Sequence, residues 1–213
     1  IPRQVATVNP EFLVLARKDK DFFEILKKCA LNIPDGFGLK IAGVRNTSTG
    51  TDLIQILARK GYRLFLIGGK QGVAKKAGDY LQILGATITG TMPGQIAKVP
   101  ELSGEEIVKI RKSRADILLV AFGQVKQEKF INKYLKKLEI PVGIGVGGAF
   151  DYFSGSLPRA PKILREIGLE WLFRLLVQPS RLKRIFTAVV VFPLLYIYST
   201  ISQLSLKNSQ KNK

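Results

Sequence analysis

Strands without a single polar residue are the feature that most constrains the fold of this chain. The six residues from Ile117 to Phe122 are all apolar, and Leu64–Ile67 is a shorter run of the same kind. A strand that is apolar at every position is buried on both faces, which is typical of parallel sheets. Each run is followed by a glycine and then by a segment with helical spacing, which indicates strand–helix–strand units.

This alternation predicts an α/β fold of the Rossmann-like type, a parallel sheet with helices on both faces. The predicted strands cover 31–34, 63–67, 86–91, 116–122 and 141–146; the predicted helices cover 9–28, 53–60, 71–84, 126–138 and a segment opened by Ser103. Asn9, Pro10 and Glu11 are favourable first residues of a helix. The first residues are therefore expected to lead directly into that helix, as in a truncated chain that lacks an opening strand.

The composition changes after Gly155, which predicts a core over 1–155 and a C-terminal membrane-associating appendage over 156–213. The appendage holds ten Lys or Arg against two acids. Residues 161–184 suit amphipathic helices with basic faces, so the appendage is expected to be helical, basic and apolar. The seventeen residues Ile185–Ile201 carry no charge. An interfacial or re-entrant helix is the first expectation for them, a tilted membrane span the second and a buried helix the third.

The net charge and the residue types of the chain limit its partners and the reactions it can catalyse. The net charge of +18 favours a polyanionic partner, such as nucleic acid, an anionic membrane or a phosphorylated substrate. Cys29 is the one cysteine of the chain, which favours a reducing compartment. The chain has no histidine, and this excludes histidine-based catalysis. Acid–base chemistry must then come from Asp, Glu, Lys or Tyr.

Four polar or glycine-rich turns follow predicted strands. In an open parallel sheet the carboxyl ends of the strands lie along one edge, where ligands bind. The turns are Asp35-Gly36, Gly68-Gly69-Lys70, Gly123-Gln124 and Gly147-Gly148-Ala149. We expect them to converge on a single site.

A series of short blocks resembles the WecG/TagA/CpsF glycosyltransferases. The blocks follow the order of that family over about residues 5–184. They are residues 7–11 (TVNPE), 33–38 (IPDGFG), 49–53 (TGTDL), 68–74 (GGKQGVA), 126–128 (KQE), 145–151 (GVGGAFD), 159–161 (RAP), 168–172 (GLEWL) and 174–176 (RLL).

The resemblance implies an inverting, metal-independent transfer of N-acetylmannosamine, or a related sugar, from UDP to an undecaprenyl-diphosphate-linked GlcNAc. The products of the family feed polymers such as wall teichoic acid. The implied partners are the UDP-sugar, the polyprenyl-diphosphate acceptor and an anionic membrane surface. Neither a nucleic acid nor a cofactor is expected, and the chain is a candidate for a homo-oligomer. The implied location is the cytoplasmic face of the plasma membrane, as a peripheral protein with or without an inserted C-terminal segment.

Asp35 is the expected catalytic base, because an inverting transfer needs a group that takes the proton of the attacking hydroxyl. The alternative is an ordinary turn-forming Asp-Gly pair. Thr7 and Asn9 are implied to line the same pocket, although Asn9 is equally suited to cap its helix. Arg45 is the arginine nearest to the family's arginine position, which Thr47 occupies here, and it is expected at the diphosphate.

Two further turns are expected to bind the donor. Gly68 and Gly69 let backbone amides approach a diphosphate at a helix start, or simply form a tight turn. Gly123 precedes Gln127 and Glu128, and Gln127 is implied to hydrogen-bond the sugar or uridine. The alternative for Glu128 is a first-turn acid that stabilises its helix.

Five arginines of the appendage are expected to meet anionic lipid or the acceptor diphosphate. A solvated basic face on a packed helix is the alternative. The arginines are Arg159, Arg165, Arg174, Arg181 and Arg184.

Two other functions compete with this interpretation. A basic nucleic-acid- or anionic-membrane-binding domain without catalysis explains the charge, but aromatic residues are not interleaved with the lysines. A nicotinamide oxidoreductase is suggested by the glycines of 143–148, which match a dinucleotide fingerprint. Residues 149–155 are not predicted to form the helix that this fingerprint requires.

Overall fold

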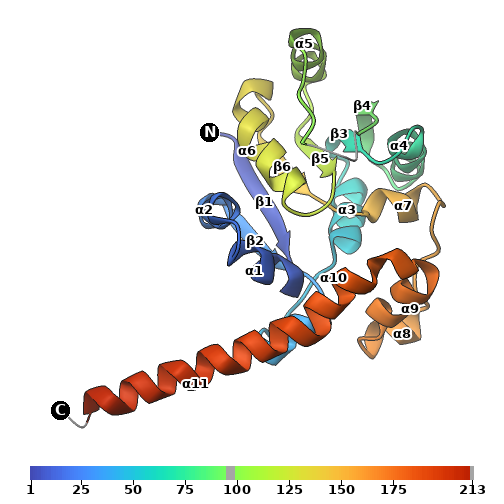
Figure 1. Cartoon of the computed structure of the whole chain (residues 1–213). Helices are drawn as coiled ribbons and strands as arrows, with labels where there is room; N and C mark the ends of the chain where they lie inside the picture. The colour runs from blue at the N-terminus through green and yellow to red at the C-terminus, as the bar shows by residue number, and fades with distance from the viewer. Residues whose placement is uncertain (95–98, 212–213) are drawn as a thin grey trace.

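The computed structural model describes residues 1–94 and 99–211, and its centre is a six-stranded, wholly parallel sheet (Figure 1). The strand order is β2-β1-β6-β5-β3-β4. The strands are β1 (Arg3–Val8), β2 (Leu31–Pro34), β3 (Arg63–Gly68), β4 (Thr87–Met92), β5 (Ile117–Ala121) and β6 (Val142–Gly145). The predicted α/β fold is confirmed.

Helices cover both faces of this sheet. The core helices are α1 (Pro10–Ala16), α2 (Lys20–Lys28), α3 (Gly50–Arg59), α4 (Val73–Ile83), α5 (Gly104–Lys112), α6 (Lys126–Leu138) and α7 (Ala149–Phe153), with a 3-10 turn η1 (Phe37–Ala42). One apolar cluster joins α3, α4 and α7 to the sheet, and a second joins α5 and α6 to its other face. Leu118 and Leu119 of β5 fall in different clusters, so its continuous apolar run serves both faces.

The start of the chain differs from the prediction. Residues 3–8 form β1, a central strand between β2 and β6, so the expectation that the first residues lead directly into a helix was wrong. The polar residue Thr7 interrupts the apolar pattern of this strand. It is tolerated in the buried sheet because its hydroxyl donates to the Gly145 carbonyl over 3.0 Å.

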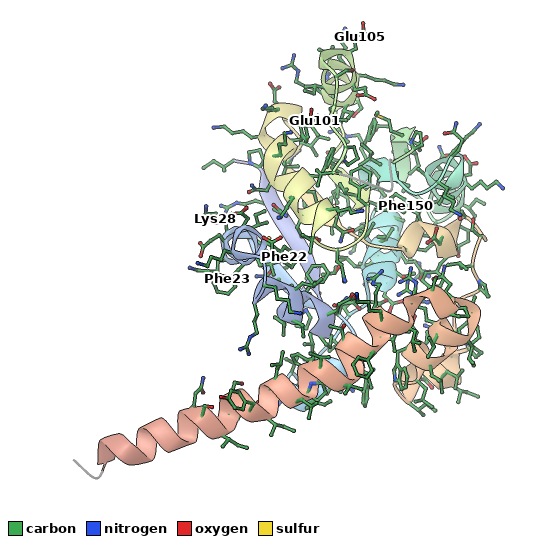
Figure 2. The ribbon with its side chains drawn as sticks, in the orientation of Figure 1. Phe22, Phe23, Lys28, Glu101, Glu105 and Phe150 are labelled. Carbon is green, nitrogen blue, oxygen red and sulfur yellow. The ribbon has the colours of Figure 1, made fainter. Side chains whose placement is uncertain are left out.

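The predicted helix over 9–28 is two helices. Asp19 caps α2 by accepting a hydrogen bond from the Phe22 amide, and its carboxylate lies 2.6 Å from Lys129 Nζ on α6. Phe22, which is labelled in Figure 2, is fully buried and packs edge-to-face on Phe12 of α1. The chain therefore turns at Asp19 so that α2 can pack against α6.

The five-residue helix α7 also differs from the expectation of no helix over 149–155. A helix does follow the glycine-rich run there. However, Gly143 and Gly145 lie inside strand β6 rather than in the turn, and β6 is the last strand along the chain rather than the first. The context of a dinucleotide fingerprint is therefore still lacking.

The appendage opens with a loop over 156–161 and is mainly helical from Lys162 to the end of its described part. It comprises α8 (Lys162–Glu166), α9 (Glu170–Val177), η2 (Pro179–Arg181), α10 (Leu182–Phe186), the π-turn η3 (Thr187–Val191) and α11 (Phe192–Lys211). The π-turn lies directly before Pro193, whose ring cannot fit a regular helical turn and whose nitrogen cannot donate. The helix therefore continues past the proline instead of ending there.

One long helix of the appendage leaves the body of the molecule. Figure 1 shows α11 extending away from the sheet, and Figure 2 shows its side chains on that projecting part. Within the described residues, Pro179–Gln203 is long and apolar enough to cross a membrane, and only 6% of its most apolar window is buried. Because so little of this segment is buried, the third expectation, a buried helix, is wrong.

Three contacts fix the appendage on the core. Phe192 is buried against Val14 of α1 and Leu39 of η1. Arg184 Nε lies 3.1 Å from a carboxylate oxygen of Glu11. An ion pair between Arg159, in the loop before α8, and Asp52 of α3 is the third contact, and it lies at the carboxyl edge of the sheet.

Candidate functional site

Strand ends from across the sheet meet the appendage at one edge. Because every strand is parallel, the turns after β1, β2, β3, β5 and β6 all lie along the carboxyl edge. Helices α9 and α10 lie beside that edge in Figure 1. The predicted common edge is therefore present, and the appendage supplies residues that the strand turns lack.

Asp35 stands at the end of β2. Its amide donates to the Val8 carbonyl over 2.7 Å, which ties it to the end of β1. Gly36 follows with a φ of 88°, a left-handed conformation that glycine adopts at little cost. The Asp35 carboxylate accepts no hydrogen bond from any described residue, and the residue as a whole is half-buried.

Three charged residues surround Asp35. Burial raises the pKa of Asp35 to about 7; the Arg174 charge opposes this rise, while Glu170 and Asp52 add to it. Arg174 and Glu170 belong to α9, and Asp52 belongs to the first turn of α3. A carboxyl group with a pKa near neutrality is suited to act as a general base.

Two arginines point at the turn after β6. A side-chain carbon at Gly148 would lie 3.0 Å from a terminal nitrogen of Arg174 and 3.2 Å from one of Arg181, so glycine leaves room for both. Burial, together with the charges of Arg174 and Arg184, lowers the pKa of Arg181 to about 10. Within the described residues Arg174 has no ion pair, and its buried Nε has no partner. Two guanidinium groups at one turn, one of them with an unpartnered Nε, are suited to bind an anion.

Residues of α7 complete this positive region. The Arg174 guanidinium lies 5.1 Å from the centre of the Tyr152 ring, a cation–π contact that holds the arginine in place. Burial raises the pKa of Asp151, although Arg181, Arg174 and Lys70 all oppose the rise. Lys70 follows β3, so the positive region extends from the appendage across to that strand.

Thr7 and Asn9 hold the structure around Asp35. Thr7 is buried, donates to Gly145 and lies under Gly50, the first residue of α3. The Asn9 side chain accepts a hydrogen bond from the Phe12 amide over 3.0 Å and so caps α1. Both residues therefore lie beside the carboxyl edge of the sheet, and their described hydrogen bonds stabilise the fold.

The glycines after β3 pack against their own surroundings. A side-chain carbon at Gly68 would lie 2.5 Å from the Ala121 carbonyl oxygen, so only glycine fits between β3 and β5. The Gly69 amide already donates to the Ala121 carbonyl, which occupies one amide expected at a diphosphate. Gly123 has a φ of 83° and open space around it, and its carbonyl accepts from the Gln127 amide.

Gln127 and Glu128 are buried rather than exposed to a ligand. Gln127 accepts from the Gly147 amide and donates to a Glu128 oxygen over 2.8 Å, so the pair supports the turn after β6. The second carboxylate oxygen of Glu128 has no partner. Burial raises the pKa of Glu128 to about 7, and the hydrogen bond from Gln127 opposes this rise.

Substituting Glu128 with glutamine is expected to remove a pH-dependent loss of stability. A carboxyl whose folded pKa exceeds its ordinary value of 4.5 loses stabilising free energy as the pH rises from 4.5 to about 7. For Glu128 this loss is roughly 3 kcal/mol at most. Urea unfolding at pH 5 and pH 8 should show that Glu128→Gln gains stability relative to the wild type only at the higher pH. Parallel profiles for the two proteins would contradict the burial of a titrating Glu128.

The other predicted arginines are placed as follows. Arg159 donates to Asp52 over 2.5 Å, which joins the appendage to α3, and Arg165 donates to the Ala160 carbonyl. Arg184 pairs with Glu11. Arg45 is exposed in the coil before α3 and has no hydrogen bond or ion pair with a described residue. Of the six, Arg174 and Arg181 lie where an anion would meet Asp35.

Sequence reasoning missed several residues of this edge. The blocks that resemble the family contain Asp52, Lys70, Asp151 and Glu170, but no role was predicted for any of them, although a carboxylate beside an apolar strand end is a usable signal. Tyr152 lies just outside these blocks. The described residues contain no group of three or more His, Cys, Asp or Glu placed to hold a metal ion.

Comparison with known proteins identifies the family of the chain. The Glycosyl transferase WecG/TagA/CpsF family model matches residues 1–206. A protein of Bacillus subtilis (strain 168), N-acetylglucosaminyldiphosphoundecaprenol N-acetyl-beta-D-mannosaminyltransferase, is 33% identical over 195 residues, which cover 84% of this chain and 73% of that protein. With the blocks quoted above lying along one sheet edge, the chain belongs to the WecG/TagA/CpsF family of glycosyltransferases.

Proposed function

We propose that this glycosyltransferase moves N-acetylmannosamine from UDP to a polyprenyl-diphosphate-linked GlcNAc, with inversion at the anomeric carbon. The observation that carries the proposal is the Asp35 carboxylate, free of hydrogen bonds to described residues, beside Arg174, whose buried Nε has no hydrogen-bond partner. A base next to an anion site is the combination that a UDP-sugar transfer requires. The name of the Bacillus subtilis relative gives the sugar and the acceptor.

The proposed step is a single displacement. The acceptor hydroxyl attacks the anomeric carbon while the bond from that carbon to the diphosphate oxygen breaks. Asp35 takes the hydroxyl proton, and UDP leaves with the bonding electrons. Arg174 and Arg181 stabilise the charge that develops on the leaving diphosphate by charge-assisted hydrogen bonds. No metal is required in this scheme, because the arginines supply the positive charge.

The appendage is proposed to hold the enzyme at the cytoplasmic face of the plasma membrane. Arg181, Lys183 and Arg184 directly precede the apolar stretch, and basic residues favour the cytoplasmic side and anionic headgroups. The exposed helix 179–203 suits either insertion along the interface or a tilted span. Either arrangement would bring the lipid-linked acceptor to the edge of the sheet. The proposal holds for a monomer and for a homo-oligomer.

A transfer assay tests the proposed reaction. The full chain is incubated with UDP-ManNAc and a synthetic polyprenyl-diphosphate-GlcNAc in detergent, and the lipid product is analysed by mass spectrometry. The expected product has gained one N-acetylhexosamine, and UDP-GlcNAc should support less transfer. An enzyme that binds NAD or DNA but neither binds UDP nor transfers a sugar would contradict the proposal in favour of one of its rivals.

The pH dependence of the reaction follows from the pKa of Asp35. Its carboxyl must be deprotonated to accept a proton, and burial raises its pKa to about 7. We therefore expect kcat to rise with pH through about 7 and to level off above it. Initial rates with saturating substrates between pH 5.5 and 9 check this. A rate that is flat down to pH 5.5 would rule out a titrating base near neutrality.

A further inference from the structure

The turn that follows Asp35 is apolar but largely exposed. η1 buries Leu39 against Val14 and Phe192, yet it leaves Phe37 48% and Ile41 53% exposed. Turns exposed on a soluble surface are usually polar, and Gly36 already provides the chain reversal. Two large apolar side chains in this position therefore require an explanation beyond the fold.

The appendage touches η1 from two sides. The Phe37 ring packs on Gly168, between α8 and α9, so closely that a side-chain carbon at Gly168 would lie 2.6 Å from it. On the other side, Ala42 and Val44 pack beside Phe192 and Leu195 of α11. The exposed residues of η1 therefore lie between α8 and the root of the projecting helix.

Helix α8 continues the same apolar surface. Ile163 is 71% exposed and Ile167 is 55% exposed, and Ile167 directly precedes the Gly168 on which Phe37 packs. We call Phe37, Ile41, Ile163 and Ile167 the η1–α8 patch. Two lysines border it: Lys40 Nζ lies 4.7 Å from the centre of the Phe37 ring, and Lys162 is exposed on α8, where it pairs with Glu166.

We propose that the η1–α8 patch inserts into the headgroup region of an anionic bilayer, so that the core itself, and not only the appendage, contacts the membrane. Exposed apolar side chains bordered by lysines are typical of interfacial insertion. The patch also adjoins α11, the helix long enough to enter a membrane. A second copy of this chain fits less well, since its basic border would face an identical basic border.

The consequence concerns the proposed site. Asp35 lies two residues before Phe37, so a bilayer that holds η1 also sets the height of Asp35 above the lipid. A diphosphate attached to a polyprenyl chain lies at that same headgroup level. The patch therefore extends the proposed function by making the catalytic turn part of the membrane contact, and it rests on the membrane part of that proposal.

Environment-sensitive fluorescence at single positions tests this. A nitrobenzoxadiazole label is attached in the full chain to Ile41→Cys or Ile163→Cys, in a Cys29→Ser background. Burial raises the pKa of the native Cys29 thiol to about 12, so it reacts slowly in any case. Ile197→Cys on α11 reports binding of the protein, and Ile83→Cys on α4, which is 83% exposed, is the matched control away from the appendage (Figure 1).

With phosphatidylglycerol vesicles, labels at 41 and 163 should gain emission several-fold, shift to shorter wavelength and be quenched by lipids that carry a quencher near the headgroup. The label at 83 should not change. A response at 197 without one at 41 and 163 would overturn the proposal, because α11 alone would then hold the protein. No response at any position would overturn the membrane role altogether. A shift at 41 that depends on protein concentration without vesicles would instead assign the patch to a second copy.

These outcomes are independent of sugar transfer. The labels report contact with lipid whether or not a donor is present. A protein that transfers sugar but shows no response at 41 and 163 keeps its proposed function and loses the patch. A protein that shows the response but transfers no sugar keeps the patch and loses its proposed function.

Discussion

Replacing Asp35 with asparagine is expected to lower kcat by about 10²- to 10⁴-fold, the usual contribution of a general base. Asparagine keeps the shape of the side chain but cannot take the acceptor proton. Binding of UDP should change little, because the diphosphate is assigned to arginines. Initial rates and calorimetric titration with UDP measure the two effects. Asp21→Asn, in an exposed turn of α2, serves as the control for loss of a surface carboxylate.

The same variant has an opposite effect on stability. The pKa of Asp35 is about 7 in the folded protein, against an ordinary value of 3.8. The folded state therefore loses stability relative to the unfolded state as the pH rises from 3.8 to 7. Asp35→Asn lacks this loss, so it should melt at a higher temperature than the wild type at pH 8, with a smaller difference at pH 5. An inactive variant that is also less stable at pH 8 would indicate a structural role instead of a catalytic one.

Removing the guanidinium of Arg174 is expected to give the second-largest loss of activity. A hydrogen bond to a charged group contributes about 1.5–3 kcal/mol. This corresponds to about 10- to 100-fold in kcat/KM for Arg174→Gln. Arg174→Lys should recover only part of the loss, because lysine cannot form the paired hydrogen bonds of a guanidinium.

The arginine prediction has a matched control within the appendage. Lys162→Gln also removes a cation, but Lys162 is exposed and pairs only with Glu166, so its kcat/KM with a detergent-solubilised acceptor should stay near that of the wild type. A raised KM for UDP-ManNAc in Arg174→Gln would place the arginine at the donor. If both variants lost activity equally, net charge rather than the site would explain the effect.

The sequence predicted the sheet well where side-chain pattern determines it. Strands β3 and β5 are apolar at nearly every position, and α6 was predicted with the bounds that it has. β1 was missed because Thr7 interrupts its pattern, and only a long-range hydrogen bond to Gly145 makes that threonine acceptable in a buried strand. The break at Asp19 depends likewise on a partner far along the chain, Lys129.

The site was predictable in part for the same reason. Asp35 was placed at the carboxyl edge because it directly follows a strand, and its role as the base was implied by the family resemblance. The neighbours that set its pKa come from α9 and α3, and no spacing in the sequence brings Glu170 or Asp52 to Asp35. Gln127 and Glu128 were assigned to the ligand by resemblance, and the fold gives them buried contacts with the turn after β6.

The central claim is a single displacement assisted by one carboxylate, and the anomeric configuration of the product tests it most directly. The disaccharide released from the lipid product is examined by NMR, using the one-bond coupling between C1 and H1 of the new sugar. Starting from the α-linked UDP-sugar, the account predicts a β-linked N-acetylmannosamine. An α-linked product would require two displacements and a nucleophile on the enzyme, and it would contradict the role given to Asp35.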